Sequence, residues 1–358
     1  MCIASRSPVN CIVPDHVLRR IAERGDDEQR RAALDTLSVS ITLRSARTQA
    51  EARGAARGRE PVASLAALRP PAVQRLIRDA NHTTDVMARV VRQEGQEAIG
   101  DAAVDEAYEY LGDTWEFFFQ VFARNSIDQR GMTIEGVVHY KESYYNAFWN
   151  GEQMVFGDGS DRIFTRMTQS LSVCAHELGH GVIQYDGPLI YQREAGALNE
   201  STADAFGAMV DQWKRGETAD QADWLIGREI LAEEVTGKAL RSMKEPGTAY
   251  DDDLLGADEQ PGNMNDFVET EEDHGGVHIN SGIPNRAFFL VATELGGHSW
   301  DEAGRIWYAT LGHERLRPNA TFRQFARLTR HVAGVIYGPQ SKQVHAVESG
   351  WSQVGVER

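Results

Sequence analysis

Two histidines and a glutamate in the segment 170–184 have the spacing of a metal-assisted hydrolytic site. His176 and His180 are four residues apart, so on a helix they share one face. Two imidazole nitrogens placed in this way can reach one metal ion at ~2.0–2.1 Å. Glu177 sits one position round the helix, where its carboxylate can take a proton from an attacking water. The alternative is a polar helix face with two unremarkable histidines.

A catalytic zinc needs a third protein ligand and one open position. Glu200 follows His180 by 20 residues, on a second helical segment that begins after a Gly-Pro breaker, so the two segments can pair antiparallel. Asp204 shares the face of Glu200 and can accept a hydrogen bond from a histidine ligand. As surface carboxylates the two acids would repel each other without a cation between them. We therefore predict that Glu200 completes a zinc site with Asp204 behind it.

The composition indicates which class of protein carries these predicted metal ligands. The chain has 358 residues, 41% hydrophobic and 25% charged, which is typical of a globular protein of about two domains. A net charge of −16 disfavours nucleic acid and anionic lipid as partners. No window reaches the ~18 apolar residues of a membrane span. The first twenty residues lack the apolar stretch of a secretory signal, so the localisation stays open between the cytoplasm and export by a non-classical route.

Charge divides the chain near residue 60. Residues 1–60 carry 11 basic and 8 acidic residues, a net charge of +3, against −19 for the remainder. Within this part, the spacing of apolar residues in the segment 14–43 predicts short amphipathic helices. The composition of the segment 48–60 predicts an exposed linker that proteases can reach. The three cysteines, Cys2, Cys11 and Cys174, are too few for a disulfide framework. We expect an N-terminal appendage, 1–60, followed by two lobes, 61–184 and 185–358.

Hydrophobic periodicity predicts an α+β first lobe and a largely helical second lobe. Strands are expected at 87–91 and 133–140. The segment 245–285 has no Lys or Arg and reads as a solvated acidic loop, with cation binding as the alternative. Helices are expected at 104–122, 171–185, 198–213, 285–295, 300–311 and 321–337.

With these motifs assembled, the chain resembles the thermolysin-like family of zinc endopeptidases (gluzincins) from about Val73 to Val354. The resemblance implies a two-lobed zincin with the zinc cleft between a mixed α+β N-terminal lobe and a largely helical C-terminal lobe. The motifs that carry it are Asn146-Ala-Phe-Trp-Asn-Gly151, His176-Glu-x-x-His180, Gly196-Ala-Leu-Asn-Glu200, Leu240-Arg-Ser-Met243, Gly275-Gly-Val-His-Ile-Asn-Ser-Gly282 and Pro318-Asn-Ala-Thr-Phe322.

The resemblance also implies roles for residues outside the zinc site. Asn146 and the carbonyl of Ala147 would hold the substrate backbone as an edge strand does, and Arg241 would contact the peptide carbonyl beyond the scissile bond. Tyr191 and His278 would donate hydrogen bonds to the oxyanion, with Asp273 orienting His278. A developing negative oxygen needs such donors. A further set, Phe164, Val173 and Leu240, matches the family's apolar pocket for the residue after the cut, with ordinary core as the alternative for each.

The function implied is that of a zinc-dependent neutral endopeptidase that hydrolyses peptide bonds on the amino side of bulky hydrophobic residues, without a covalent intermediate. The alternative is a catalytically silent, metal-binding regulatory protein on the same fold. The presence of Glu177, His278 and Tyr191 favours the enzyme. The expected partners are polypeptide substrates and the chain's own N-terminal segment, and we expect a monomer.

The chain departs from the family at the paired calcium site. The matching positions are Ser172, Asp211, Asp223, Leu225 and Arg228, of which two are carboxylates. We interpret Arg228 as a built-in replacement for the calcium charge, with a solvent-exposed arginine as the alternative. The double calcium site is therefore expected to be lost, although calcium elsewhere stays possible.

The N-terminal segment resembles the short propeptide of the protealysin-type subgroup, through Cys11-Ile-Val-Pro14, Leu18, Ile21 and Ala22. Such segments cover the cleft and are removed by proteolysis, so we expect a latent precursor. Cys11 has two interpretations. It either presents a thiolate to the zinc or docks the propeptide as a small apolar residue, and the second is favoured.

Overall fold

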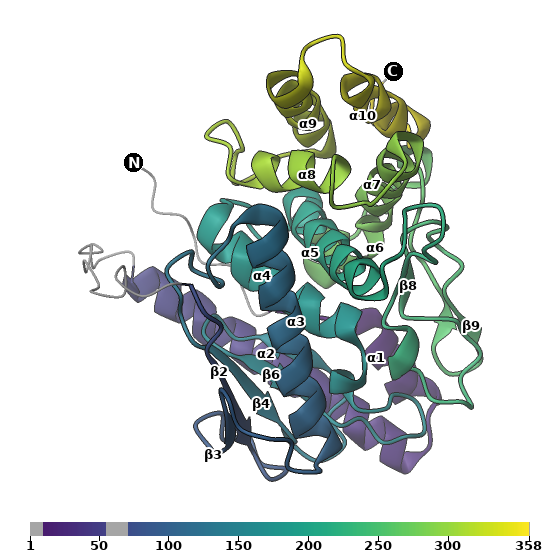
Figure 1. Ribbon diagram of the computed structural model, residues 1–358. Helices are drawn as coiled ribbons and strands as arrows, with labels where there is room; N and C mark the ends of the chain where they lie inside the picture. The colour runs from purple at the N-terminus through teal and green to yellow at the C-terminus, as the bar shows by residue number, and fades with distance from the viewer. Residues whose placement is uncertain (1–9, 55–70, 358) are drawn as a thin grey trace.

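The computed structural model describes residues 10–54 and 71–357. Figure 1 shows a lobe built on β2, β3, β4 and β6 at one end of the molecule and the helices α8, α9 and α10 at the other. The long helices α4 and α5 lie between these two ends. The expected combination of an α+β first lobe and a helical second lobe is confirmed.

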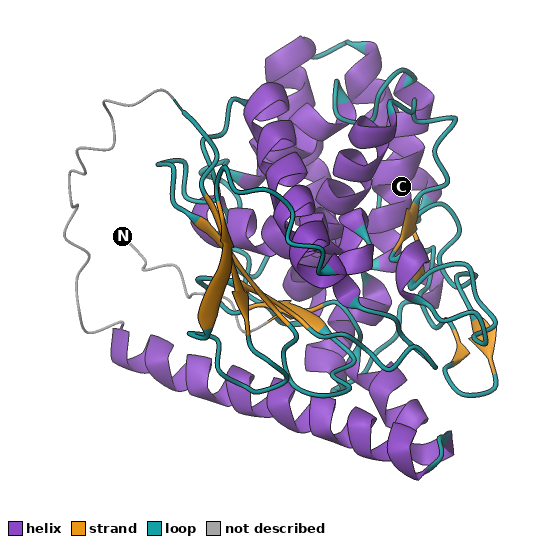
Figure 2. Cartoon of the chain, turned by 60° about the horizontal axis from the view of Figure 1, so that its bottom comes forward, coloured by secondary structure: helices purple, strands orange, loops and turns teal. Residues whose placement is uncertain are grey.

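The N-terminal segment contributes a strand and two helices to the fold. These are β1 (Asn10–Cys11), α1 (Asp15–Arg24) and α2 (Asp27–Gly54). Helix α1 buries Val17, Leu18 and Ile21, the spacing of one helix face. Figure 2 shows α2 crossing beneath the sheet as one long helix. Helix α1 is short, as predicted, but α2 is not, and it continues to Gly54, so residues 48–54 of the expected linker are helical. The rest of that linker, 55–60, lies outside the described residues.

A six-stranded mixed sheet forms the first lobe. Its order is β1-β5-β6-β4-β2-β3, so the N-terminal strand β1 forms one edge, antiparallel to β5. Strands β2, β4 and β6 run parallel, whereas β3 and β5 are antiparallel to their neighbours. Strand β4 lies where the sequence predicts it, and β3 is displaced by two residues from the prediction. The bounds are β2 (Arg75–Asp79), β3 (Arg89–Gln93), β4 (Ile134–Val138), β5 (Ala147–Trp149) and β6 (Met154–Phe156).

Helix α3 (Ala102–Phe122) packs on β2 and β4 and begins at the N-cap Asp101, whose side chain accepts a hydrogen bond from the Val104 amide. Helices α4 (Leu171–Asp186) and α5 (Arg193–Arg215) follow as a packed pair. Glycines allow their close approach. A Cβ on Gly179 would lie 3.2 Å from the Ala203 Cα, and one on Gly207 would lie 2.6 Å from the Ser172 carbonyl oxygen.

The second lobe is built mainly from helices. The predicted helices α7, α8 and α9 are confirmed, and α9 begins with a capping box between Thr321 and Gln324. Two helices, α6 and α10, were not predicted. None of the helices in the described ranges has both the length and the apolar character that crossing a membrane requires. The helices of this lobe after α5 are α6 (Asp273–Asn280), α7 (Gly282–Leu295), α8 (Ala303–Leu311), α9 (Phe322–Tyr337) and α10 (Lys342–Gln353).

The acidic segment 245–285 is more ordered than a solvated loop. It contains the paired strands β9 (Asp251–Asp252) and β10 (Gly256–Ala257), and α6 within its last part. A second short pair joins β7 (Leu225–Ile226) to β8 (Arg241–Ser242). At the start of α6, His274, Gly275 and Gly276 have left-handed φ values of 55°, 85° and 74°, so the chain turns sharply there. This turn brings Asp273 back against His278.

Candidate active site

The three predicted zinc ligands meet between α4 and α5, and all are buried. His176 Nε2 lies 3.0 Å from His180 Nε2, and Glu200 oxygens lie 3.6 Å and 3.4 Å from these two nitrogens. Two atoms bound to one zinc at ~2.0–2.1 Å in tetrahedral geometry lie ~3.3–3.4 Å apart. Glu200 Oε2 is buried and accepts no hydrogen bond from the described residues. The donor set therefore fits a zinc ion.

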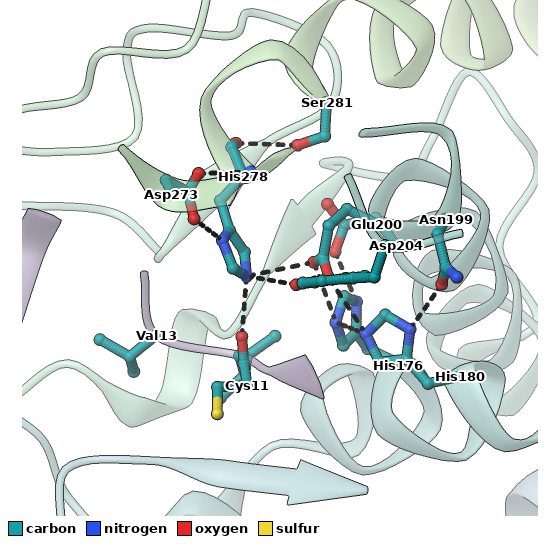
Figure 3. A network of polar contacts seen from close by, with 12 residues as sticks. Cys11, Val13, His176, His180, Asn199, Glu200, Asp204, Asp273, His278 and Ser281 are labelled. Carbon is teal, nitrogen blue, oxygen red and sulfur yellow. Dashed lines mark hydrogen bonds and ion pairs between the residues drawn. The ribbon is translucent and has the colours of Figure 1, made fainter. Parts of the chain in front are cut away.

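A second layer of polar groups holds the two histidines (Figure 3). His176 Nδ1 is 2.8 Å from Asp204 Oδ1, as predicted, and His180 Nδ1 is 2.9 Å from Asn199 Oδ1. Burial lowers the pKa of His180 to about 3 in spite of the neighbouring Glu200 carboxylate. A neutral imidazole is the form that binds a metal. Asn199 was not predicted, although its position beside Glu200 in the Gly196–Glu200 motif was a signal.

Asp204 makes more contacts than the sequence suggested. Its two oxygens accept hydrogen bonds from Arg241 Nε and Nη2, each at 2.8 Å, and Oδ2 also accepts one from Asn285 Nδ2 at 2.9 Å. Burial would raise the pKa of Asp204, but Arg241 and His176 outweigh it and lower that pKa. The buried carboxylate thus links a zinc ligand to Arg241.

Glu177 lies on α4 beside the two histidines and is fully buried. Its Oε2 accepts a hydrogen bond from the Trp149 amide at 3.0 Å, which fixes the carboxylate against β5. Its Oε1 accepts no hydrogen bond from the part of the chain that the structure describes. Burial, followed by the nearby Glu200 charge, raises the pKa of Glu177 well above its usual value. One oxygen is therefore held while the other is available to a proton.

His278, Tyr191 and Asp273 form a donor group on the other side of Glu200. Asp273 Oδ1 lies 2.6 Å from His278 Nδ1, and Asp273 Oδ2 accepts the His278 amide at 2.7 Å. The Tyr191 hydroxyl donates to Glu200 Oε1 and lies 3.1 Å from His278 Nε2. Burial alone would lower the pKa of His278, but the Asp273 and Glu200 carboxylates raise it to about 9.

The N-terminal segment lies across this group of residues. The carbonyl oxygen of Cys11 accepts a hydrogen bond from His278 Nε2 at 2.9 Å, and that of Ile12 accepts one from Arg241 Nη1 at 2.9 Å. The Ile12 amide donates to the Ala147 carbonyl oxygen at 3.2 Å. Asn146 contacts the next residue through two hydrogen bonds, from the Val13 amide at 2.9 Å and to the Val13 carbonyl oxygen at 3.0 Å. The segment thus occupies the groups that the sequence assigned to a substrate backbone.

The Cys11 side chain turns away from the zinc ligands (Figure 3). Its Sγ lies 3.7 Å from Ser40 Oγ and packs in an apolar cluster with Val137, Tyr144 and Phe148. The favoured interpretation of Cys11 as a docking residue is confirmed, and a zinc-bound thiolate is not what the structure places there. Cys174 is buried on α4, and Cys2 lies outside the described residues.

The three residues assigned to the apolar pocket are buried, at 0% exposure for Phe164 and Val173 and 2% for Leu240. They belong to the same apolar core cluster as Ile12 and Val13 of the N-terminal segment, which are also fully buried. Their burial fits both the pocket and the ordinary-core interpretation.

The charged residues among the positions that match the paired calcium site are held in ion pairs. Arg228 Nη2 contacts Asp223, as predicted, whereas Asp211 pairs with Arg215 at 3.1 Å and not with Arg228. Arg215 also lies 3.1 Å from Glu229. Burial raises the pKa of Asp211 to about 6 in spite of Arg215. Two arginines, and not one, thus face the acidic groups of this region.

Comparisons with known proteins match nearly the whole described chain. Residues 72–184 match the model of the thermolysin metallopeptidase catalytic domain, residues 187–356 match that of the thermolysin metallopeptidase alpha-helical domain, and residues 10–38 match the protealysin propeptide. An extracellular metalloprotease of Pectobacterium carotovorum subsp. carotovorum is 50% identical over 98% of this chain and 97% of its own length. Protease PrtS of Photorhabdus sp. (strain Az29) is 47% identical over 80% of this chain and 77% of its own.

A solved structure agrees with these matches. The precursor of protealysin, a metalloproteinase from Serratia proteamaculans, superimposes with a TM-score of 0.86 at 48% identity. The similarity covers 97% of this chain and 99% of that one, so it includes the N-terminal segment.

Proposed function

The chain belongs to the thermolysin family of zinc metalloendopeptidases and carries a protealysin-type propeptide, and from this premise we propose that it cuts polypeptides on the amino side of bulky hydrophobic residues. In this proposal His176, His180 and Glu200 hold the zinc. The zinc supplies a Lewis acid that lowers the pKa of a water and polarises the peptide carbonyl.

The chain's own residues perform the remaining steps. Glu177 takes the water proton at Oε1, its unpartnered oxygen, and passes the proton to the leaving nitrogen. Tyr191 and His278 donate hydrogen bonds to the oxyanion, and Asp273 keeps His278 in place. Asp204 fixes the ring of His176, so that its Nε2 faces the metal.

The observation that carries the proposal is the register of residues 11–13 against β5. The Cys11 carbonyl oxygen accepts a hydrogen bond from His278, the proposed oxyanion donor, and the Ile12 carbonyl oxygen accepts one from Arg241. This register supports an alignment in which the Cys11–Ile12 peptide bond corresponds to the bond cut in a substrate. The residue after that bond is Ile12, a bulky apolar side chain that is fully buried. This supports the pocket of Phe164, Val173 and Leu240 and cleavage before a hydrophobic residue.

The same contacts support latency. A segment that holds Asn146, Arg241 and His278 leaves a substrate backbone without its partners. We take 1–60 as the propeptide with its linker, 61–184 as the first lobe and 185–358 as the second. Two relatives are named extracellular metalloproteases, so we propose that this chain is also exported. We keep the expectation of a monomer as part of the proposal.

The zinc centre is tested with Glu177→Gln. The amide fills the same space but cannot take the proton, so the zinc content should equal that of the parent enzyme while peptide hydrolysis falls about 10²–10⁴-fold. Zinc is measured by mass spectrometry of the metal, and hydrolysis with casein after the propeptide has been removed. Parent-like hydrolysis would exclude Glu177 as the base, and loss of both zinc and hydrolysis would show a damaged site. Abundant zinc without hydrolysis in the parent enzyme would favour the silent alternative.

A further inference from the structure

A second group of metal-binding side chains lies at one edge of the sheet. Within the described residues, three or more donors of metal-binding type gather within 4.8 Å of one another at two places, the zinc ligands and the trio His82, His139 and Asp158. The strands β2, β4 and β6 are parallel neighbours, and each member of the trio follows one of them. The carboxyl ends of three adjacent strands therefore bring the trio together.

The donor atoms of the trio lie close together, and one of their contacts has hydrogen-bond length. Asp158 Oδ2 lies 2.8 Å from His139 Nδ1 and 3.5 Å from His82 Nδ1. The corresponding contacts between the catalytic zinc ligands span 3.0–3.6 Å. The centroids of the two imidazole rings are 5.4 Å apart, with the rings tilted by 53°, so the rings do not stack. Three donor atoms thus lie near enough to one another to share one ion.

Asp101 contacts the ring nitrogen of His139 that does not face the trio, as Asp204 contacts the second ring nitrogen of His176 at the catalytic zinc site. His139 Nε2 lies 3.1 Å from Asp101 Oδ2. Asp101 is itself fixed as the N-cap of α3, because Oδ1 accepts the Val104 amide at 3.2 Å. A carboxylate on one ring nitrogen sets the tautomer and turns the other nitrogen toward a metal.

The backbone of the trio is unusual as well. His82 and His139 have left-handed φ values of 59° and 52°, which non-glycine residues seldom adopt. The His82 amide donates to the His139 carbonyl oxygen at 2.8 Å, so the two strained residues are tied together. The His82 side chain is 55% exposed, whereas His139 and Asp158 are 19% and 26% exposed. One side of the trio is therefore open to an entering ion and to water ligands.

We propose that His82, His139 and Asp158 bind a second divalent metal ion, separate from the catalytic zinc, with Asp101 supporting His139. Two imidazole nitrogens and one carboxylate oxygen favour zinc or a similar transition metal over calcium or magnesium, which prefer oxygen ligands. The large net negative charge of −16 attracts cations to the surface.

The site would brace the strand that holds the peptide backbone. On either side of Asp158, the Gly157 amide donates to the Asn146 carbonyl oxygen at 3.0 Å and the Gly159 amide to the Tyr144 carbonyl oxygen at 3.2 Å. A metal that ties Asp158 to the ends of β2 and β4 therefore stiffens the loop on which Asn146 rests. Its role is structural.

The alternative to a metal ion at this site is a proton on His139. The hydrogen bond to Asp158 is the main reason that the pKa of His139 is raised to about 9, although burial opposes it. A protonated His139 between Asp158 and Asp101 would form an ordinary ion-pair cluster. Counting the bound metal distinguishes the two cases directly.

The test uses the full chain with Glu177→Gln, which does not digest itself. The protein is equilibrated with micromolar Zn²⁺ at pH 8.5, freed of excess metal by gel filtration and analysed for zinc per chain. We expect two zinc ions, falling to one when His82→Ala or Asp158→Asn is added. His345→Ala, at an exposed histidine of α10, is the matched control and should keep two. Circular dichroism confirms that each variant is folded.

The thermal midpoint provides a second readout. Zinc beyond one equivalent should raise the midpoint of the His345→Ala control and leave that of His82→Ala unchanged, because an ion stabilises only a state that binds it. One zinc per chain in the parent, or two in both His82→Ala and Asp158→Asn, would overturn the proposal. Neither result would bear on the catalytic zinc, which is tested separately by peptide hydrolysis after the propeptide has been removed.

Discussion

His278 Nε2 donates a hydrogen bond to the main-chain carbonyl oxygen of Cys11, over a distance of 2.9 Å and a sequence separation of 267 residues. Its other ring nitrogen, Nδ1, faces the Asp273 carboxylate at 2.6 Å, an arrangement that suits a protonated ring. The pKa of about 9, raised by Asp273 and Glu200 against the effect of burial, agrees with this state. The His278 N–H group, which is suited to stabilise an oxyanion, is thus hydrogen-bonded to the propeptide carbonyl of Cys11.

The uncut chain should become more active when a substitution weakens the binding of the propeptide to the active site. Ile12→Ala removes a fully buried side chain of the propeptide. Such truncations cost about 2–5 kcal/mol, and each 1.4 kcal/mol is about tenfold in an equilibrium. We expect casein hydrolysis by the uncut variant to exceed that of the uncut parent by at least about tenfold.

The control for this prediction is Glu23→Gln, at an exposed position of α1 in the same propeptide, which should leave the activity low. Mass spectrometry after the assay must show that the chains are intact. Full activity of the uncut parent would mean that the propeptide does not inhibit.

Processing is expected within about residues 44–61. The first part of this region is helical to Gly54, and residues 55–61 lie outside the described part of the chain. If the enzyme cuts itself, Glu177→Gln protein stays full length in isolation and is trimmed when active enzyme is added. Sequencing the new N-terminus locates the cut. Trimming of purified Glu177→Gln protein alone would require another protease.

Cleavage before bulky apolar residues follows from the pocket assigned to Phe164, Val173 and Leu240. Binding there scales with the apolar area buried, at roughly 25 cal/mol per Å², so Leu and Phe should be preferred over Ala at the new N-terminus. A peptide library digested with the processed enzyme and sequenced from the new N-termini gives the preference. Enrichment of charged residues at that position would rule out an apolar pocket.

Calcium should have little effect on stability. The carboxylates at the family's calcium positions are paired with Arg228 and Arg215. We therefore expect equal thermal midpoints with and without millimolar Ca²⁺ in buffer free of EDTA, since an ion that does not bind the native state cannot stabilise it. A rise of many degrees that persists in Asp223→Asn would place calcium elsewhere, and one abolished by it would contradict the loss of the site.

The zinc ligands could be predicted because residues close to one another in the sequence bring them together. His176 and His180 are one helical turn apart, and Glu200 lies on the next helix, so a helical period is sufficient to bring them together. Asp204 was predicted to contact a histidine for the same reason. Its bonds to Arg241 and Asn285 join α5 to segments that no local pattern relates to it.

The missed elements are those that depend on distant partners. Strand β1 has two residues, too few for any periodicity, and exists because β5 offers it an edge about 140 residues later. The pairing of Asp273 with His278 was expected from the family resemblance alone, because no local pattern predicts the left-handed turn at His274, Gly275 and Gly276 that brings the two residues together. The trio at the sheet edge was invisible in the sequence, since it required knowing that three strands are parallel neighbours.

Because the propeptide docks through contacts that do not need a peptide link to the body, cutting the chain after α2 does not by itself empty the site. Ion pairs such as Lys141–Asp35 and Arg162–Asp26 survive the cut, together with the backbone bonds of residues 11–13. The cut turns an intramolecular inhibitor into a separate molecule. Inhibition by a covalently attached propeptide does not depend on protein concentration, whereas inhibition by a cleaved propeptide weakens on dilution. A nicked preparation should therefore be nearly silent when concentrated and active when diluted, which makes protein concentration itself a regulator of this enzyme.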